Sequence, residues 1–555
     1  MINASLSYLK RLPRYREVAN VLVKNGFGFV INSVGNRHPW LRRHRHRQEL
    51  ETIGDSLPKR LRRACEELGP TFVKLGQLLS TRADLLSPEY ISELEKLQDN
   101  VLPIPFEQVE AVLAQDGLDY SLIFSAFEQV PIAAGSIGQV HQATLSNGAQ
   151  VIVKVKRPGI DRQMAIDLAI ILDLANYAEK YQGWAKHYRV SELVEELAAA
   201  LCNELDFRKE ARNAERFKQN FASNPHVIIP GVFWQYSTEN VLVMEYVPGI
   251  KISDVAAIQA GGYEVGRIVN HLVECLFQQI YLDGLFHADP HPGNIAIAEG
   301  EAIILYDFGQ VGFVDQLTRD KYIDLVIGMM RYDTEGVTRA LLNIAIDDHP
   351  VRLNDLRRDV GRLAQKYYGV PFSGINVGEA LREILELSVK HQLRMPPELT
   401  LMAKMLLTME SLVTTLDPGI SLVDIAQPYG KKALKERYSA KRMGHEVRSA
   451  MLELADIARA LPRNVNNLAQ RLEEGELRIK MEYSNIRDML VRIDIISNRI
   501  CLAIVMSSIL IGCSLIVNQA ETYFLRHFPL VEVGFVLAVL IGLYLAYSII
   551  RSGRY

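Results

Sequence analysis

Three polar side chains within residues 282–309 have the types and the spacing that chemistry on a phosphate group requires. Asn294 follows Asp289 by five residues, and Asp307 begins the triplet Asp-Phe-Gly. Asn294 and Asp307 offer oxygen donors that could hold Mg²⁺ against nucleotide phosphates, while Asp289 could accept the proton of an attacking hydroxyl or water. The simpler alternative is an acidic turn that binds no metal, because Asp, Asn and Gly are common in turns. The complete string, in this order, favours phosphoryl transfer.

A short hairpin is predicted to hold the two candidate metal ligands in place. Residues 295–306 are predicted to form two apolar strands joined by a turn. Asn294 and Asp307 then stand at opposite ends of one hairpin, as in the catalytic loop and metal-binding triplet of protein kinases. His287 occupies the position of the kinase His, but Ala288 replaces an Arg that normally receives activation-loop phosphate. We therefore expect no regulation of that kind.

Residues 133–140 (AAGSIGQV) match part of the kinase phosphate loop G-x-G-x-x-G-x-V, with Ala133 at the first glycine position. Such a loop alone is weak evidence, because tight hairpins also use glycine for backbone freedom. Lys154 follows at the right distance in a predicted strand, where kinases carry the Lys that contacts the α- and β-phosphates. The predicted nucleotide-binding residues of this region are Lys154 and Ile132, Ala133, Ala134, Gly135, Ser136, Ile137, Gly138, Gln139 and Val140.

Lys154 needs a carboxylate partner to hold it in place. Residues 191–219 are predicted to form one long amphipathic helix, which offers Glu204, Asp206 and Glu210 as candidates. The sequence pattern does not choose among the three. The alternative is that all of them belong to a solvated, charged helix face.

The region around Lys154 is predicted to be a lobe rich in β-strands. Its predicted strands are residues 127–132, 140–144 and 150–155, with a hairpin turn at Asn147-Gly148. A further apolar strand, residues 241–247, leads to Pro248-Gly249. In a kinase this segment is the hinge, so backbone groups around Glu245 and Val247 would hydrogen-bond adenine.

Composition limits the classes of function. The chain has 555 residues, of which 48% are hydrophobic and 23% charged, which suits two or more globular domains. The net charge of −3 gives no global field for nucleic acid. The five cysteines have neither CxxC nor Cys/His spacing, so we expect buried thiols in a reducing compartment, without zinc or disulfides.

The N-terminal region is predicted to be basic at first and then helical. No secretory signal is predicted, because the first residues build no long apolar core. Residues 37–47 (RHPWLRRHRHR) are either a solvated surface or a surface for anionic lipid head groups. From Leu61 onward the pattern is helical, and Lys74 and Gln77 lie on one face, where the pattern alone indicates ordinary surface residues.

Two apolar runs near the C-terminus predict a membrane hairpin. Residues 500–517 are uncharged, and residues 529–550 carry only Glu532. Each run approaches the roughly 20 residues that span a bilayer, although a buried helix of a soluble protein could resemble one of them. Residues 431–442 before the hairpin are basic, and they could be either a solvated helix face or a second surface for lipid head groups.

Charges around the hairpin predict its orientation. Arginines flank its outer ends at 492, 499, 551 and 554, while Arg526 is the one basic residue of the connecting loop. This bias places both ends and the kinase-like part on the cytoplasmic side. Small residues at 534, 538, 542 and 546 form a stripe that would allow close helix packing, either within the hairpin or between protomers of a homodimer.

These motifs resemble the UbiB family, also called the ABC1 or ADCK atypical kinases, over about residues 61–427 and more weakly to the C-terminus. The specific marks are Lys74-Leu75-Gly76-Gln77 as the KxGQ motif, the alanine-rich nucleotide loop, Glu204-Leu205-Asp206 as the ExD motif, and residues 287–294. Members of that family support ubiquinone and related isoprenoid-quinone metabolism. The resemblance leaves little room for an ordinary kinase.

The resemblance assigns further roles. In the family, the KxGQ helix lies over the substrate cleft and its Lys meets the ExD acids. It therefore implies that Glu210 is the partner of Lys154, and that access to the cleft is gated by Lys74, Gln77, Glu204 and Asp206. The family usually has alanine where this chain has Gly135. The resemblance therefore does not predict the nucleotide preference of this chain.

The predicted fold is α+β, a protein-kinase-like two-lobed fold with an N-terminal helical extension and a C-terminal transmembrane helical hairpin. The predicted domains are a basic N-terminal segment (1–60), the helical KxGQ extension (61–115), the kinase-like N-lobe (116–250) and C-lobe (251–428), a basic and amphipathic helical linker (429–498) and two transmembrane helices (499–551).

The expected function is that of a membrane-anchored atypical kinase or ATPase that binds ATP or ADP with Mg²⁺ and supports ubiquinone-like biosynthesis or prenyl-lipid handling. The alternative is a nucleotide-gated scaffold for a lipid-biosynthetic complex. Ordinary protein phosphorylation is disfavoured, because no long activation segment follows Asp307. The expected partners are anionic membrane lipids, an isoprenoid lipid and lipid-biosynthetic enzymes, at a bacterial inner membrane. The phosphate acceptor is not predicted.

Overall fold

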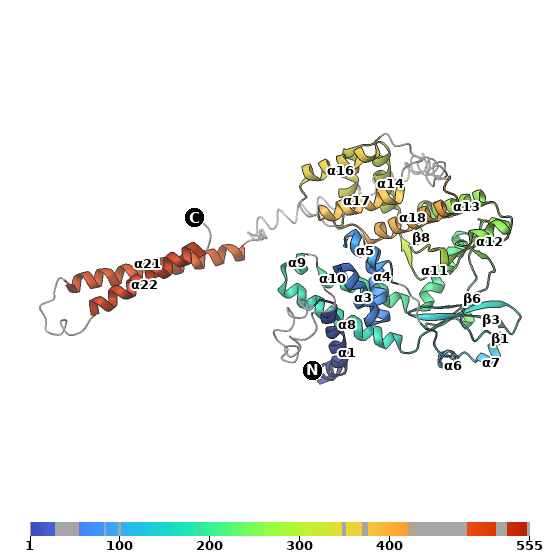
Figure 1. Ribbon diagram of the computed structural model, residues 1–555, viewed down its shortest axis with the longest axis horizontal. Helices are drawn as coiled ribbons and strands as arrows, with labels where there is room; N and C mark the ends of the chain where they lie inside the picture. The colour runs from blue at the N-terminus through green and yellow to red at the C-terminus, as the bar shows by residue number, and fades with distance from the viewer. Residues whose placement is uncertain are drawn as a thin grey trace, which may run out of the picture. The chain divides into compact units, whose positions relative to one another are not determined.

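The computed structural model divides the chain into two compact units, residues 1–442 and 443–555, which are described separately (Figure 1). The structure describes residues 2–27, 55–82, 85–97, 102–187, 189–346, 351–368, 376–419, 425, 486–517 and 530–551. The two basic clusters predicted at residues 37–47 and 431–442, and the loop around Arg526, lie outside the described residues.

The N-lobe contains a five-stranded antiparallel sheet in the order β1-β3-β4-β6, with β2 paired to β3. Its strands are β1 (Phe124–Phe127), β2 (Ala133–Ala134), β3 (Gly138–Leu145), β4 (Gln150–Lys156) and β6 (Val241–Glu245). Val151, Val153 and Val155 are fully buried on one face of β4, together with apolar residues of α6 (Phe106–Gln115). Because side chains alternate along a strand, Lys154 lies on the opposite face.

One strand prediction in this sheet is wrong. Residues 127–132 were expected to pair as a strand, but β1 ends at Phe127 and the chain leaves the sheet before β2. Pro131 lies in this stretch and has no N–H with which to continue the ladder. The predicted turn at Asn147-Gly148 is confirmed, since Gly148 adopts a φ of 85° and the Asn147 side chain accepts the N–H of Ala149.

The long helix predicted over residues 191–219 is two helices in the structure. They are α10 (Val190–Glu204) and α11 (Phe207–Asn220). Asp206 begins the second helix as its N-cap, accepting the backbone N–H of Arg208 at 3.1 Å. The break matters for the site, because it turns the first turn of α11 and its Glu210 toward β4.

The C-lobe begins with two short β-units. β9 (Ile295–Ile297) and β10 (Ile303–Leu305) form the predicted hairpin, with β5 (Val227–Ile228) and β7 (Ile250–Lys251) on its outer edges. β8 (Leu285–His287) pairs with β11 (Val311–Phe313). Helix α14 (Gln316–Met330) starts three residues after β11, so the Asp-Phe-Gly triplet leads into helix without a long intervening segment, as predicted.

The remaining C-lobe is helical and shares one large apolar core with β8 to β10 and α11. Its other helices are α12 (Val255–Ala260), α13 (Val265–Phe277), the π-helix η4 (Gln278–Asp283), α15 (Thr334–Ile344), α16 (Leu353–Tyr367), α17 (Val377–Lys390) and α18 (Pro397–Leu416). Together with the N-lobe sheet, this gives mixed helices and strands in a kinase-like arrangement.

The N-terminal extension packs as a separate apolar cluster against α8. Its helices, with those on the N-lobe side, are α1 (Ile2–Lys24), α3 (Leu57–Leu68), α4 (Pro70–Ser80), α5 (Pro88–Leu94), α7 (Tyr120–Ile123), α8 (Ile160–Tyr181) and α9 (Gly183–His187). Arg14 of α1 donates to the buried carboxylate of Asp167 at 2.7 Å and to the carbonyl of Leu68 at 2.6 Å. These bonds hold α1 to both α3 and α8.

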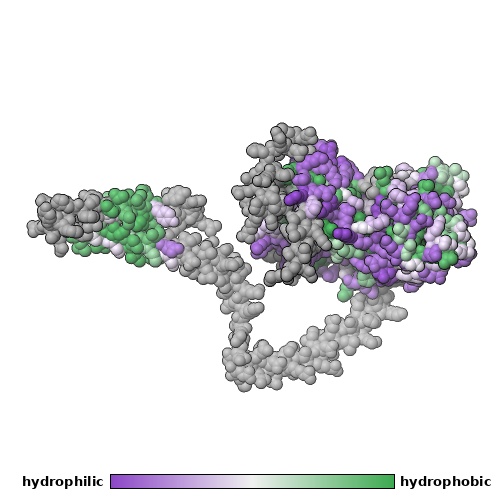
Figure 2. Space-filling model, turned by 90° about the horizontal axis from the view of Figure 1, so that it is seen from below, coloured by the Kyte–Doolittle hydropathy of each residue, from purple (hydrophilic) through white to green (hydrophobic). Residues whose placement is uncertain are grey.

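The described part of the second unit is two packed helices, α21 (Ile486–Val517) and α22 (Leu530–Arg551). Figure 2 shows hydrophobic residues over the described surface of this pair. A Cβ added at Gly534 would lie 2.5 Å from the Cys513 sulfur, and Ala538 is 3% exposed, so these two members of the small-residue stripe pack closely within the helix pair of the same chain.

Within the described residues, α18 is the one helix that is long and apolar enough to cross a bilayer, and half of its most apolar stretch is buried inside the protein. The described apolar stretches of the C-terminal pair, Ile500–Leu515 and Val533–Leu545, are shorter. Core helices of soluble proteins have the properties of α18 as well. The predicted membrane hairpin therefore stays a prediction at this stage.

Candidate functional site

Lys154 lies at the centre of the candidate site. Its ammonium is 2.8 Å from both carboxylate oxygens of Glu210 and 3.6 Å from Oδ2 of Asp307. β4 presents the lysine, the first turn of α11 presents the glutamate, and the segment after β10 presents the aspartate. Of the three acids that the sequence offered to Lys154, the structure selects Glu210. The aromatic ring of Phe207 lies 5.3 Å from the same ammonium.

Burial and neighbouring charges set the protonation of this cluster. Burial opposes the charged form of Lys154, but Asp307 and Glu210 outweigh it and raise the lysine pKa above its usual value. Burial also disfavours an ionised Asp307, yet Lys154 and the N–H of Gly309 lower its pKa to about 2. Burial raises the pKa of Glu210 to about 7, against the effect of Lys154. Lys154 is therefore a cation and Asp307 an anion at neutral pH.

Hydrogen bonds among its own residues hold the catalytic loop in place. His287 is buried, and its Nδ1 accepts the N–H of Asp289 at 3.1 Å. Burial lowers the pKa of His287, which keeps the ring neutral and able to accept. The side-chain amide of Asn294 donates to the carbonyl of Asp289 at 3.2 Å, and the N–H of Tyr306 donates to the carbonyl of Asn294 at 3.0 Å. These bonds connect the loop to the segment that carries Asp307.

The two predicted metal ligands fit Mg²⁺. The amide nitrogen of Asn294 is engaged by a carbonyl, so its amide oxygen is the atom free to turn elsewhere. Asp307 uses Oδ1 for the N–H of Gly309 at 2.8 Å, while Oδ2 faces Lys154. Among the described residues no group of three His, Cys, Asp or Glu could hold a metal by itself. A pair of oxygen ligands completed by nucleotide phosphates is the usual arrangement for Mg²⁺.

The glycine loop connects β2 to β3 in a tight turn, in which the N–H of Gly135 donates to the carbonyl of Gly138 at 2.8 Å. Arg157 donates to the Gly135 carbonyl at 2.8 Å and to the Leu102 carbonyl at 2.8 Å, which ties the loop to the end of the extension. The Ser136 hydroxyl is buried and has no hydrogen-bond partner in the described part of the chain. A phosphate oxygen would satisfy such a group.

Alanine substitutions at the two loop glycines should affect nucleotide binding to very different extents. A Cβ at Gly138 would lie 2.6 Å from the Val155 carbonyl oxygen, a backbone atom that cannot move aside, whereas a Cβ at Gly135 would meet only the Gly138 carbonyl oxygen at 3.6 Å. We expect Gly138→Ala to weaken nucleotide binding strongly and Gly135→Ala, its matched control, to leave it nearly unchanged. Titration of each variant with a fluorescent ATP analogue measures this. Equal losses in both variants would contradict the prediction.

The hinge contains a contact that the sequence did not predict. The hydroxyl of Tyr306 donates to the carbonyl of Val247 at 3.0 Å, so this carbonyl already has a protein partner. Glu245 donates its N–H to the Gly231 carbonyl at 2.8 Å. Adenine would therefore use the other backbone groups of the predicted hinge, the carbonyl of Glu245 and the N–H of Val247. A tyrosine directly before Asp-Phe-Gly was the available sequence signal.

Two of the predicted gating residues, Lys74 and Glu204, contact each other beside the Asp-Phe-Gly segment, whereas Asp206 and Gln77 bond elsewhere. Lys74 of α4 lies 3.7 Å from Glu204, and Glu204 accepts a hydrogen bond from Gln310 at 2.9 Å. Gln310 follows the Asp-Phe-Gly triplet directly, so the extension is connected to the segment that carries Asp307. Asp206 instead bonds Arg208, besides capping α11.

The Gly and Gln of the KxGQ motif both hold the segment after α5. Gln77 donates to the carbonyl of Leu97 at 3.0 Å. A Cβ at Gly76 would lie 2.4 Å from the end of the Leu97 side chain, so a larger residue here would force that leucine to move. The motif thus fixes α4 to the end of α5, and Lys74 projects from that fixed helix toward Glu204.

Lys404 is a site residue that sequence reasoning missed. Its ammonium lies 3.0 Å from Oδ1 of Asp289, although the two residues are 115 positions apart. It belongs to α18, whose apolar sequence contains no other Lys or Arg. A single basic residue in such a helix was the available signal.

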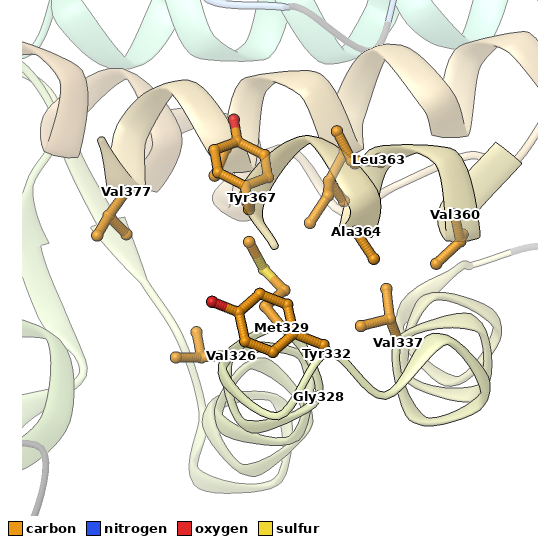
Figure 3. A pocket seen from close by; sticks show the side chains of 12 residues that line it. Val326, Gly328, Met329, Tyr332, Val337, Val360, Leu363, Ala364, Tyr367 and Val377 are labelled. Atoms are coloured by element: carbon orange, nitrogen blue, oxygen red, sulfur yellow. The ribbon is translucent and has the colours of Figure 1, made fainter. Parts of the chain in front are cut away.

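The described C-lobe also has an apolar cavity that contains none of the predicted site residues. It has a volume of about 90 Å³ and lies between α14, α15, α16 and α17 (Figure 3). It is lined by Val326, Gly328, Met329, Tyr332, Val337, Val360, Leu363, Ala364, Tyr367, Val377, Ala380 and Ile384. Polar groups for phosphate chemistry do not converge on it, so it is distinct from the candidate site.

Comparison with protein families gives three matches along the chain. The ABC1 atypical kinase-like domain matches residues 96–341, the UbiB helical domain residues 360–421, and the ABC1/UbiB kinase-like C-terminal domain residues 484–551. The first match contains the lysine cluster and the catalytic loop. The second contains Lys404, and the third contains the C-terminal helix pair.

Similar proteins cover most of this chain. A Clostridium pasteurianum protein, "Uncharacterized protein in hydrogenase 1 5'region", is 32% identical over 97% of this chain and 99% of its own length. "Probable protein kinase UbiB" of Cellvibrio japonicus is 34% identical over 76% of this chain and 78% of its own. "Protein ACTIVITY OF BC1 COMPLEX KINASE 7, chloroplastic" of Arabidopsis thaliana is 36% identical over 76% of this chain and 62% of its own. The predicted family resemblance is confirmed.

Proposed function

Because this chain belongs to the ABC1/UbiB family of atypical kinase-like proteins, we propose that it is a membrane-anchored kinase or ATPase that acts on, or gives access to, an isoprenoid lipid. The observation that carries the proposal is the cluster in which Lys154 contacts Glu210 at 2.8 Å and faces Asp307 at 3.6 Å. Three separate parts of the chain meet there in the arrangement that kinases use to bind ATP.

Each residue of the site has a separate role in the proposed reaction. Lys154, held by Glu210, binds the α- and β-phosphates, and the loop from Gly135 to Gly138 covers them. Asn294 and Asp307 would hold Mg²⁺, and the metal would supply positive charge that neutralises the phosphate oxygens.

Asp289 takes the proton of the acceptor, either water or a hydroxyl. The acceptor oxygen bonds to the γ-phosphorus, the bond from that phosphorus to the bridging oxygen breaks, and ADP leaves with the electron pair. The products are ADP and a phosphorylated acceptor, or ADP and inorganic phosphate when water attacks. Asp289 then releases its proton to solvent.

The C-terminal helix pair supports membrane anchoring. Large apolar side chains such as Ile511 (62% exposed), Leu515 (66%), Leu540 (59%) and Leu543 (63%) cover its surface, which would be unfavourable in water. The arginine distribution supports a cytoplasmic kinase-like part. A role in ubiquinone-like biosynthesis, at a bacterial inner membrane, is proposed from the family alone. Close packing of Gly534 and Ala538 favours a role for the small residues within the hairpin, and a homodimer through these helices remains the alternative proposal.

A second candidate is the nucleotide-gated scaffold. The observation that favours it is the contact of Lys74 with Glu204 and of Glu204 with Gln310, which places the extension against the metal-binding segment. Such a contact could report the nucleotide state to a partner without turnover. A protein-kinase role is disfavoured by the short connection between β11 and α14.

One experiment tests the proposal with the full chain. Mg²⁺-ATP hydrolysis is measured without lipid and with vesicles of phosphatidylcholine, of phosphatidylcholine with phosphatidylglycerol, and of that mixture with farnesol. We expect stimulation by the anionic vesicles and a further increase with farnesol. A variant with arginine at Ile511, Leu515, Leu540 and Leu543 should lose the stimulation, because each arginine costs roughly 3 kcal/mol in a bilayer. The matched alanine variant should keep it.

The outcomes separate the candidates. Turnover that no vesicle changes would argue against a lipid-coupled enzyme. Bound nucleotide with no turnover in any vesicle would favour the scaffold. Stimulation that survives the arginine variant would show that the helix pair is not the membrane anchor.

A further inference from the structure

Lys404 occupies an unusual place for a lysine. It lies in the middle of α18, where the other charged residues are Glu398 and Glu410. Its side chain is 28% exposed, and its ammonium is directed to Oδ1 of Asp289 at 3.0 Å. A lysine in an apolar helix is costly unless its charge is paired. The position therefore depends on the acidic groups of the active site.

The catalytic loop itself provides no permanent positive charge. Residues 287–294 read HADPHPGN and contain neither Lys nor Arg. Phosphoryl transfer nevertheless spreads negative charge over the three equatorial oxygens of the transferred group, and enzymes place cations there. Lys154 contacts Glu210 and Asp307 and is assigned to the α- and β-phosphates, so it does not serve the transferred group. Among the described residues, Lys404 is the cation in contact with Asp289.

Geometry relates this cation to the transferred group. A general base lies within hydrogen-bond distance of the acceptor hydroxyl, and the acceptor oxygen attacks the γ-phosphorus. An ammonium 3.0 Å from the base carboxylate is therefore within reach of the γ-phosphoryl oxygens. We propose that Lys404 leaves Asp289 when ATP is bound and donates hydrogen bonds to the transferred phosphoryl group. This inference rests on the proposed function and adds a catalytic residue from the helical domain.

The step balances without any further reactant. Asp289 receives the acceptor proton, the bond from the acceptor oxygen to the γ-phosphorus forms, and the bond from that phosphorus to ADP breaks. Lys404 keeps its own proton throughout and acts only through charge and hydrogen bonding. Its departure also releases the Asp289 oxygen that must accept the proton.

The N-terminal extension provides a second acid for Lys404. Glu95 follows α5 directly, burial raises its pKa, and the positive charges of Lys404 and Arg382 act against that rise. The charge of Lys404 therefore acts on Glu95 of the extension as well as on Asp289, with which it pairs at 3.0 Å.

The test compares Lys404→Met and Lys404→Arg with Lys390→Met in the full chain. Lys390 forms a similar pair with Asp359 at 2.7 Å, also in the helical part, and is the matched control. We expect Lys404→Met to lower kcat about 10²–10³-fold while Mg²⁺-ADP affinity stays the same. Lys404→Arg should restore most of kcat, because arginine keeps the charge and the donors. Unchanged or increased turnover in Lys404→Met would overturn the proposal, and an increase would identify an inhibitory contact.

A binding measurement tests the contact between Lys404 and the transferred phosphoryl group independently of turnover. Aluminium fluoride with Mg²⁺-ADP imitates the transferred phosphoryl group. We expect the wild-type chain to bind this mixture more tightly than Mg²⁺-ADP alone, and Lys404→Met to lose the difference. If wild-type turnover does not exceed that of Asp307→Asn, the proposed function fails. The Lys404 proposal fails if aluminium fluoride brings no gain in the wild type, or the same gain in Lys404→Met.

Discussion

Replacing Asp307 by asparagine should lower Mg²⁺-ATP turnover about 10³-fold, the upper end of the cost of removing one charge-stabilising group. Asparagine keeps the shape but loses the negative charge that Lys154 and the Gly309 N–H stabilise in the native carboxylate, whose pKa is about 2. Both the metal and Lys154 thereby lose a charged partner. Steady-state phosphate release at saturating ATP measures the effect.

The control for this variant is Asp315→Asn. Asp315 lies in the same segment but caps α14, accepting the N–H of Thr318 at 3.0 Å. Its substitution should leave turnover close to wild type, because asparagine is also a good N-cap. Turnover in Asp307→Asn that equals the Asp315→Asn rate would show that the segment does not bind a catalytic metal.

The second large effect is expected from Lys154→Met, which should lower both the stability of the protein and its affinity for nucleotide. Removing the ammonium leaves Glu210, 6% exposed, and Asp307 facing one another without their shared cation. Breaking a buried pair in this way costs about 3 kcal/mol of unfolding free energy. Nucleotide affinity should also fall about 10²-fold, because a charge-assisted contact to phosphate is lost.

A double variant distinguishes these two consequences. Adding Glu210→Gln to Lys154→Met removes the uncompensated acid, so part of the stability should return while nucleotide binding stays weak. Thermal unfolding and nucleotide titration on the same samples measure both. Lys156→Met is the matched control, since Lys156 lies two positions further on β4 and pairs with Asp161 at 3.1 Å. It should lose stability without losing nucleotide affinity. Recovery of binding in the double variant would contradict the assigned role of Lys154.

Local motifs were predicted well because their chemistry depends on neighbours in the sequence. The hairpin that carries Asn294 and Asp307 needed only two apolar strands and a turn, and the structure has it. The helix prediction over residues 191–219 failed because apolar periodicity continues through Asp206, whose capping bond ends one helix and begins another. An aspartate followed by a charged first turn was the signal for that break.

The sequence alone determined the order of the phosphoryl-transfer motifs, the glycine loop before Lys154 and the family, because these depend on residue type and spacing within short segments. The residue pattern left three acids open to Lys154, and the family resemblance implied Glu210. The tertiary structure shows that contact directly, because Glu204 ends α10 and Asp206 caps α11, whereas Glu210 in the first turn of α11 lies 2.8 Å from Lys154. Only the tertiary structure placed Lys404 against Asp289, 115 residues away. Contacts at that separation arise from the packing of α18 on the C-lobe core, and no local pattern encodes the distance between two packed elements.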